Sequence, residues 1–342
     1  MIDLTIVIVN YETRELLSRC LAGVAEACAF DSTLIVETIV VDNGSRDESV
    51  PCARASHVEP RVVALTENLG FAAAANHGLR LRRGRHVLLL NTDVEMDPSM
   101  LRRGVGILDG RENAGVLGAA LRHPSGRRQR SVHALPDLVS ELVPEPILRW
   151  VRPEMISGKP GTGSVEATMK PRVVEAVRGA VFFIRGELLE TVGLLDEGYF
   201  FFLEETDYCW RMRSAGYDVL HCDSLRAIHG LGASSKRRVP LATRIEFHRS
   251  LYRYLDRRCS RGVSRVARSV RVTRMGIGLL GLLCLSAFSS AARRRLAERM
   301  GLFLWHLRGR PEDEGLASAL LADGARFNVA DVGEVTGCGD VA

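Results

Sequence analysis

The sequence lacks the patterns that mark several common classes of protein. Its eight cysteines form no C-x-x-C pair and no spacing typical of a disulfide-rich secreted domain, so we interpret them as reduced thiols. No Gly-x-Gly-x-x-Gly turn and no P-loop follows the first apolar run, which argues against a dehydrogenase. With 46% hydrophobic and 25% charged residues, the 342-residue chain has a globular composition and room for one large α/β domain with an appendage.

Lysine is nearly absent, and charge is unevenly distributed. Only three of the 46 Lys and Arg residues are Lys, and the net charge is +5. Residues 257–274 contain seven Arg and no acid, whereas residues 311–342 contain seven acids and one Arg. This asymmetry predicts an anionic partner, either a membrane or a nucleic acid. The opening residues lack the features of a signal peptide and are expected to form a buried strand, which predicts a cytoplasmic catalytic part.

Short apolar runs alternate with helical stretches in the first part of the chain, which predicts an α/β fold with a mostly parallel sheet flanked by helices. The expected strands are 4–9, 35–41, 61–65 and 86–91, and the expected helices are 14–28, 46–56, 71–83 and 98–109. Each strand ends in a polar cluster. Because ligands bind at the carboxyl ends of strands in open α/β sheets, these clusters should converge on one crevice.

Order is expected to loosen beyond residue 121, with a loop at 157–164 rich in Gly. A strand at 175–184, helices at 186–192 and 205–215, and a hairpin at 218–229 should complete the domain. Residues 275–292 carry no charge, and eighteen residues is the lower limit for a spanning helix. Since a basic helical segment precedes them, we predict interfacial membrane attachment; an ordinary core helix is the alternative.

Two strand ends carry carboxylates in an otherwise apolar context. Asp42 ends the second strand, and a buried carboxylate needs a partner, for which a pyrimidine N3–H is one candidate. Ser45 and Glu48 match a helix capping box. Asp93 follows the fourth strand and could hold Mg²⁺ or Mn²⁺, which prefer oxygen ligands. Tyr11 offers an aromatic face that could stack on a base or form part of the rim.

A third element combines aromatics and acids in the run Tyr-Phe-Phe-Phe-Leu-Glu-Glu-Thr-Asp. On a helix Glu204 and Asp207 share a face while Glu205 points elsewhere, so one ion-pair cluster with Arg211 cannot absorb all three acids. Desolvation beside the aromatics would raise the pKa of one acid toward that of a general base. His229 ends the last strand-like run, where a lone His is either structural or a ligand.

Taken in order, these motifs resemble family 2 glycosyltransferases over residues 3–255, and within that family the bacterial rhamnosyltransferase branch, whose members build cell-envelope glycans. The motifs are Ile-Val-Asn-Tyr, Val-Asp-Asn-Gly-Ser, Asn-Leu-Gly-Phe-Ala-Ala-Ala-Ala-Asn, Leu-Asn-Thr-Asp, Arg-Gly-Ala-Val-Phe-Phe-Ile-Arg, Glu-Glu-Thr-Asp-Tyr-Cys-Trp-Arg and Ile-His-Gly.

The resemblance implies a GT-A fold in residues 1–255. Composition and charge predict a basic and apolar helical extension at 256–310 and an acidic, flexible tail at 311–342. The resemblance also implies Glu205 as the catalytic base of an inverting transfer and Asp93 and His229 as ligands of Mg²⁺ or Mn²⁺. Asn91 stands where the family's D-x-D motif has its first acid. The residues implied in substrate binding are Asn10, Tyr11, Asp42, Asn43, Asn68, Gly70, Asn91, Gly179, Ala180, Glu204 and Asp207.

The implied partners are a nucleotide-sugar donor, with TDP-rhamnose first and UDP-sugars as an alternative, and a glycan or polyprenyl-linked acceptor. No nucleic acid is expected, because no RNA-binding or zinc pattern accompanies the Arg excess. Two other classes of protein fit these motifs less well. A sugar-nucleotide pyrophosphorylase usually carries a Gly-rich basic loop after its first strand, which is missing here. A non-catalytic binding module would not need Asp93, Glu205 and His229 together.

Overall fold

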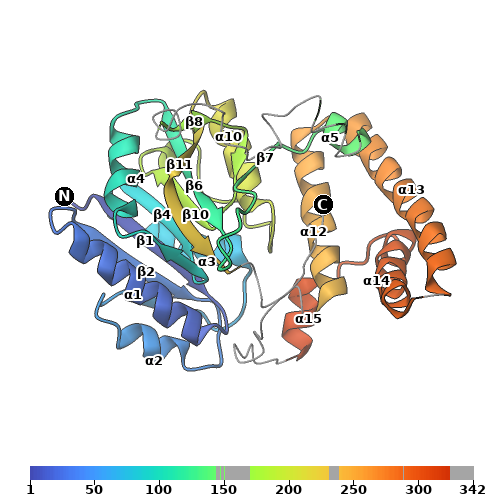
Figure 1. Ribbon diagram of the computed structural model, residues 1–342, viewed down its shortest axis with the longest axis horizontal. Helices are drawn as coiled ribbons and strands as arrows, with labels where there is room; N and C mark the ends of the chain where they lie inside the picture. The colour runs from blue at the N-terminus through green and yellow to red at the C-terminus, as the bar shows by residue number, and fades with distance from the viewer. Residues whose placement is uncertain (144–146, 148–149, 151–169, 231–238, 288, 324–342) are drawn as a thin grey trace.

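The computed structural model describes residues 1–143, 147, 150, 170–230, 239–287 and 289–323. The expected loop at 157–164 and residues 324–342 of the expected acidic tail lie outside the described residues. Within the described part, an α/β unit is followed by a group of helices at its side (Figure 1).

A large mixed sheet forms the centre of the α/β unit. Its strands follow the order β3-β2-β1-β4-β10-β6-β11-β5, with β8 paired to β11. The four strands expected at the start of the chain are parallel and are β1 (Leu4–Asn10), β2 (Val36–Asp42), β3 (Arg61–Ala64) and β4 (His86–Asn91). The other strands are β5 (Val94–Met96), β6 (Ala114–Arg122), β8 (Arg172–Val173), β10 (Val181–Arg185) and β11 (Asp218–His229). A second small sheet pairs β7 (Val132–His133) with β9 (Ala176–Val177).

Helices cover both faces of the sheet, which confirms the predicted α/β class. One core layer joins Ile6 and Ile8 to α1 (Arg14–Phe30), α2 (Ser49–Arg54) and α4 (Met100–Asp109). The other joins Val7 to α3 (Phe71–Leu81), α9 (Leu188–Thr191) and α10 (Glu204–Ser214). Since successive strand side chains point to opposite faces, an apolar run such as β1 can feed both layers.

Three local expectations were wrong. Residues 218–229 form one long strand that runs parallel to β6 with an irregularity between Cys222 and Arg226, so there is no hairpin there. Residues 175–184 break into β9 and β10 around Gly179. The capping box of Ser45 and Glu48 is also absent, because α2 starts at Ser49 and the Ser45 hydroxyl accepts the backbone N–H of Glu12 instead.

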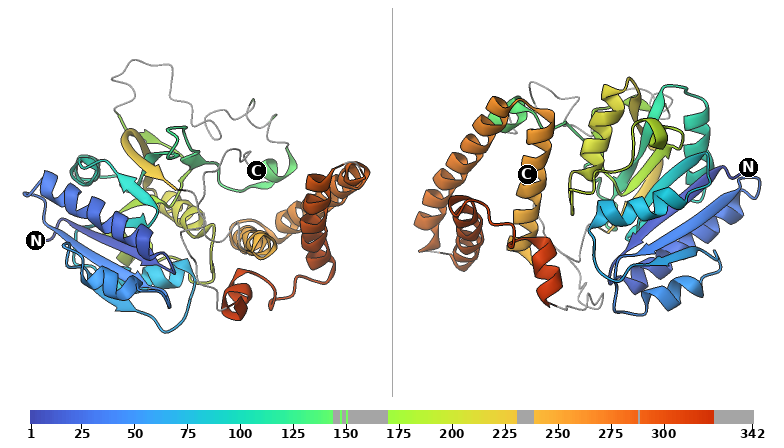
Figure 2. Two further views of the ribbon diagram at one scale, coloured as in Figure 1. Left: turned by 60° about the horizontal axis from the view of Figure 1, so that its bottom comes forward. Right: turned by 180° about the vertical axis from the view of Figure 1, so that it is seen from behind.

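The C-terminal helices form a third apolar cluster beside the sheet. They are α12 (Pro240–Arg258), α13 (Arg261–Ser286), α14 (Ser290–Leu307) and α15 (Leu316–Asp323), with the short α5 (Leu138–Leu142) against α13. Their core includes Tyr252, Leu255 and Trp305 and also takes in Tyr199 and Leu203 from the segment before α10. Figure 2 shows α13 and α14 on the side of α12 away from the sheet. The basic and apolar segments expected as two helices form one helix, α13, which has the length and composition to cross a membrane.

Candidate active site

The ends of β1 and β2 meet in one hydrogen-bonded cluster. Asn10 lies directly opposite Asp42 in the parallel register. Its side-chain amide donates to Asp42 Oδ1 at 2.8 Å, and the Ser45 backbone N–H donates to Asp42 Oδ2 at 2.9 Å. Both oxygens of this buried carboxylate therefore have protein partners, and these hydrogen bonds offset the cost of its burial. The sequence alone did not identify these partners.

A second cluster holds the loop before α3. The Asn43 amide donates to Asn68 Oδ1 at 2.9 Å and to the Gly70 carbonyl at 3.2 Å, while Asn43 Oδ1 accepts the backbone N–H of Leu69. Burial raises the pKa of Tyr11, and a side-chain hydrogen bond with Asn68 opposes that shift. The structure thus brings Tyr11, Asn43, Asn68 and Gly70 together beside the Asn10–Asp42 cluster.

Gly70 joins this side of the site to the aromatic run. Its φ is +85°, and a Cβ there would lie 2.5 Å from the Phe200 carbonyl oxygen, so only glycine fits. The next residue, Phe71, donates its backbone N–H to the same carbonyl at 2.7 Å. Phe202 and Leu203 then adopt φ values of +72° and +64°, a conformation that is uncommon for bulky residues and that sets the start of α10.

Glu204 and Glu205 begin α10 with buried carboxylates. One oxygen of each, Oε2, is buried without a hydrogen-bond partner. Burial, and then the charge of Glu205, hold the pKa of Glu204 well above its usual range. Burial also raises the pKa of Glu205, against the lowering effect of its own backbone N–H and the Arg178 guanidinium. The nearby Arg178 charge favours the ionised form of Glu205, while burial raises the pKa of both acids.

Gly179 lies directly against Glu205. A Cβ at Gly179 would approach Glu205 Cβ to 3.3 Å and Cγ to 3.4 Å. The adjacent Ala180 accepts the backbone N–H of Asn91 at 3.1 Å, which places this turn at the end of β4. The break between β9 and β10, which the sequence did not predict, places Gly179 against Glu205 and Ala180 against Asn91.

Asp207 has a different environment from its two neighbours. Its side chain is fully buried, Arg211 Nε donates to Oδ2 at 2.9 Å, and Arg258 Nε donates to Oδ1 at 2.7 Å. The Tyr199 hydroxyl donates to Oδ1 at 3.4 Å. Because Arg258 belongs to α12, this carboxylate ties the first turn of α10 to the C-terminal helices. Asp207 was predicted to bind substrate, and the hydrogen bonds of its carboxylate are made with these protein groups.

We expect Asp207→Asn to lower the free energy of unfolding by about 3–5 kcal/mol, because it leaves two guanidinium groups in a buried position without their counter-charge. Urea unfolding followed by circular dichroism measures the change. Glu190→Gln is the matched control, since Glu190 pairs with Arg82 but is 77% exposed, and exposed pairs contribute little. Equal stability of the two variants would contradict a structural role for Asp207.

Asp93 and His229 meet at the end of β4 and β11. His229 Nε2 lies 3.3 Å from Asp93 Oδ1, and the Gly230 backbone N–H donates to the Asp93 carbonyl. The other ring nitrogen of His229, Nδ1, lies beside Gln129. Gln129 Nε2 donates to the His229 carbonyl at 2.5 Å, so Gln129 Oε1 faces Nδ1 at 2.9 Å. This orientation of the amide assigns a ring proton to Nδ1, so Nε2 is the nitrogen that faces the carboxylate and, when unprotonated, presents its lone pair there.

Two acceptors that face each other fit a divalent cation. A metal-binding His commonly donates its other N–H to an oxygen, as His229 does to Gln129. Among the described residues no group of three or more His, Cys, Asp or Glu could hold a metal. Mg²⁺ and Mn²⁺ accept few protein ligands, since substrate phosphates and water complete their shell. No pattern in the sequence indicated Gln129, which lies in the loosely patterned stretch after residue 121.

Comparisons with known proteins identify the family and the fold. The sequence profile described as Glycosyl transferase family 2 matches residues 5–163. The N-terminal part of this chain is a family 2 glycosyltransferase domain. The expected family and its rhamnosyltransferase-like character are thereby confirmed.

Two curated relatives of this glycosyltransferase are 26% identical to it. One is a low-salt glycan biosynthesis hexosyltransferase of Haloferax volcanii, aligned over 66% of this chain and 67% of its own. The other is the N-acetylglucosaminyl-diphospho-decaprenol L-rhamnosyltransferase of Mycobacterium tuberculosis, aligned over 75% of this chain and 85% of its own.

A mannosyltransferase of Pyrobaculum calidifontis, solved with GDP-Man and Mn²⁺, superposes on the glycosyltransferase with a TM-score of 0.56 at 15% identity. The match covers 90% of this chain and 88% of the other. At that identity the likeness concerns the fold alone, and it confirms the predicted GT-A fold.

Proposed function

We propose that this glycosyltransferase transfers a sugar from a nucleoside diphosphate to a hydroxyl of a polyprenyl-linked or other cell-envelope glycan acceptor, with inversion at the anomeric carbon. Rhamnose from TDP-rhamnose is our first choice of donor. The observation that carries the proposal is that the Glu205–Gly179 contact and the Asp93–His229 pair both lie near the end of β4, where the Asn91 backbone N–H donates to the Ala180 carbonyl. The name of the mycobacterial relative, which gives a rhamnosyltransferase with a diphospho-decaprenol substrate, supports the donor and the acceptor class.

Glu205 is the general base in this proposal. Its unpartnered oxygen accepts the proton of the acceptor hydroxyl while that oxygen attacks the anomeric carbon from the face opposite the nucleotide. Gly179 leaves the space against Glu205 free of a side chain, which gives the acceptor access. The sequence points to no second nucleophile on the other sugar face, so one displacement inverts the configuration. Burial, and then the charge of Glu205, raise the pKa of the neighbouring Glu204.

Asp93 and His229 would hold Mg²⁺ or Mn²⁺, with Gln129 fixing the imidazole. A bound cation supplies positive charge that stabilises the departing diphosphate. The Mn²⁺ in the solved Pyrobaculum mannosyltransferase supports this choice. Asn10, Asp42, Asn43 and Tyr11 form the nucleotide side, and Asn68, Gly70 and Asn91 lie between that side and the base.

A screen of sugar nucleotides by thermal shift tests the donor. A donor at about 100 times its Kd stabilises the folded protein by about 2.7 kcal/mol, which a melting curve resolves. TDP-rhamnose is expected to give the largest shift in the presence of Mn²⁺. A larger shift with a UDP-sugar would favour the alternative donor, and binding of a donor with no transfer or hydrolysis would favour a non-catalytic glycan-binding relative.

We further propose that residues 256–310 attach the catalytic part, residues 1–255, to the inner face of the cytoplasmic membrane. The apolar half of α13 supports this, because Ile277, Leu280 and Leu283 are 64%, 66% and 58% exposed. Seven Arg residues between 257 and 274 precede that half, and each basic residue near an anionic surface adds about 1 kcal/mol. Residues 311–342 would form an acidic tail.

Replacing Leu280 and Leu283 together by Glu is expected to lower partition into anionic vesicles by more than about tenfold, since each buried Leu contributes about 1.5–3 kcal/mol. Vesicle flotation of the full-length protein measures it. Phe30→Glu is the matched control, because Phe30 is 62% exposed at the end of α1, outside the proposed attachment. Unchanged flotation of the double variant would show that α13 is an ordinary packing helix.

A further inference from the structure

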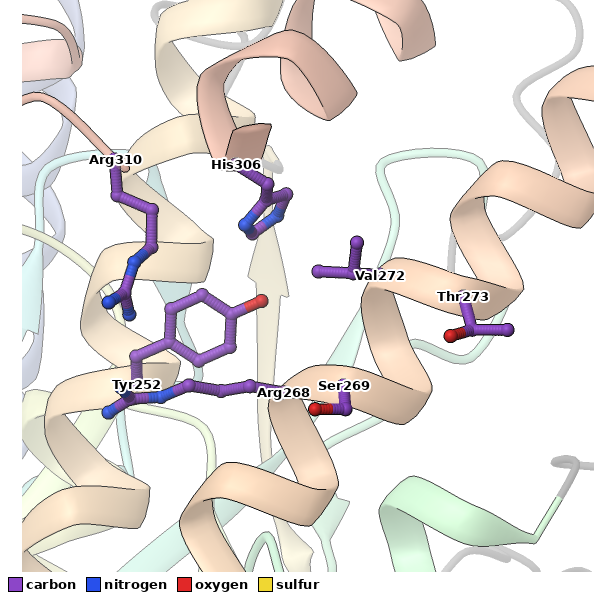
Figure 3. Close-up of a pocket in the computed structure, with 7 residues that line it drawn as sticks. All are labelled: Tyr252, Arg268, Ser269, Val272, Thr273, His306 and Arg310. Atoms are coloured by element: carbon purple, nitrogen blue, oxygen red, sulfur yellow. The ribbon is translucent and has the colours of Figure 1, made fainter. Parts of the chain in front are cut away.

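A second polar site lies among the C-terminal helices, apart from the strand ends. It is a pocket of about 410 Å³ between α12, α13 and the end of α14 (Figure 3). No acidic residue lines it. Its polar lining consists of Tyr252, Arg268, Ser269, Thr273, His306 and Arg310.

Two guanidinium groups in this pocket lie beside one aromatic ring. The Cζ atoms of Arg268 and Arg310 are 5.1 Å and 5.6 Å from the centre of the Tyr252 ring. Arg268 forms an ion pair with Asp256, but its Nε is buried without a hydrogen-bond partner. Arg310 has no carboxylate within ion-pair distance among residues 1–323 as far as these are described. Within the described part of the chain, the positive charge of Arg310 is therefore not neutralised by a carboxylate.

Two neutral groups add unused hydrogen-bonding capacity. Tyr252 is 4% exposed, and its hydroxyl has no partner. Figure 3 shows this hydroxyl pointing into the space between His306 and Val272. His306 Nε2 is buried without a partner as well. Burial, and then the charges of Arg310 and Arg271, lower the pKa of His306 to about 4.

We propose that this pocket binds a phosphate or diphosphate group. A phosphate offers several charged acceptor oxygens, and guanidinium groups bind such oxygens in pairs. The ligand oxygens would also accept from Tyr252 and His306, whose polar atoms are otherwise buried without partners. The phosphate can belong to a lipid headgroup, because the basic half of α13 that lines the pocket continues directly into the exposed apolar half. Free phosphate or diphosphate is the other source.

The test uses the full-length protein in excess chelator, so that no divalent cation holds diphosphate at the strand ends. One arm titrates inorganic pyrophosphate by calorimetry. The other compares flotation with vesicles of phosphatidic acid in phosphatidylcholine and with vesicles of phosphatidylcholine alone. Arg310→Gln is the test variant, and Arg265→Gln is the matched control, since Arg265 is exposed on α13 outside the lining and its loss removes the same charge.

Arg310→Gln is expected to weaken binding by about tenfold relative to Arg265→Gln, the effect of one hydrogen bond to a charged group. A loss in both arms, or with vesicles alone, assigns the site to a lipid phosphate, and a loss with pyrophosphate alone assigns it to a free anion. If Arg310→Gln melts early, Tyr252→Phe replaces it, because that change removes only the hydroxyl. Binding by the folded variants equal to that of Arg265→Gln in both arms overturns the proposal. Transfer is not measured, so failure of the proposed catalysis gives a separate result.

Discussion

Glu205→Gln is expected to lower the transfer rate by about 10²–10⁴-fold while the affinity for the donor stays near that of the wild type, because removing a positioned base raises the barrier without removing ground-state contacts. Single-turnover assays give the rate, and donor titration gives the affinity. The amide keeps the shape of the carboxylate against Gly179, so the site should keep its packing. A melting curve accompanies the kinetics, since a buried amide can itself change stability.

Glu204→Gln is the matched control for this experiment. It removes the neighbouring acid on the same helical turn, whose pKa is raised by burial and then by the charge of Glu205. We expect it to keep most of the transfer rate and to alter folding or substrate placement at most. Should Glu205→Gln retain more than about a tenth of the wild-type rate while folded Glu204→Gln is inactive, the base is Glu204.

The pH profile follows from the same pair of acids. A general base must be ionised, so kcat/KM falls as the pH drops through the pKa of Glu205. Because burial raises that pKa, the fall begins above the ordinary range of glutamate. Since Glu204 and Glu205 interact, the limb reports the pair. Residual transfer by Glu205→Gln should lack this limb.

Asp93→Ala and chelation of divalent cations should each lower transfer by roughly 100-fold or more, because a bound cation contributes several kcal/mol of charge stabilisation to the leaving diphosphate. Added Mn²⁺ should restore the chelated wild type and leave the variant inactive. Glu95→Gln is the matched control, as Glu95 is an exposed acid two residues away. Full transfer in excess chelator would contradict the metal assignment.

Gln129 offers a further measurement within this metal experiment. Gln129→Met removes the acceptor for His229 Nδ1–H, and changes of this kind weaken metal binding by about 10–100-fold. The variant should need more Mn²⁺ for half of its maximal rate and recover at saturating Mn²⁺. A merely structural role for Gln129 would lower the rate at every metal concentration alike.

The strand ends were predictable because the sheet is parallel. Apolar runs identify β1, β2 and β4, and parallel register alone then brings Asn10, Asp42 and Asn91 to one edge. The contact between Asp93 and His229 was harder to predict from the sequence. His229 reaches that edge because residues 218–229 form one strand, whereas the sequence pattern suggested a hairpin. Periodicity gives the direction of a side chain within a strand and says nothing of which strand lies next to it.

The three acids of α10 show the same limit at a single turn. Helical spacing separated Glu205 from Glu204 and Asp207, and the structure does place Glu205 against Gly179. Helical spacing could not distinguish Glu204 from Asp207. In the structure they differ, because one oxygen of Glu204 is unpartnered while Asp207 binds two guanidinium groups. That difference depends on Arg258, which lies on another helix far along the chain.

The contact of Gly70 with the Phe200 carbonyl has a consequence for how variants of this site combine. One backbone contact joins the loop before α3, which we propose faces the nucleotide, to the segment that sets the start of α10. Side chains introduced at Gly70 would have to displace that segment, and with it the helix that carries Glu205. Substitutions in the two halves therefore share one packing unit, and their free-energy effects on transfer will not add, as expected for residues in contact.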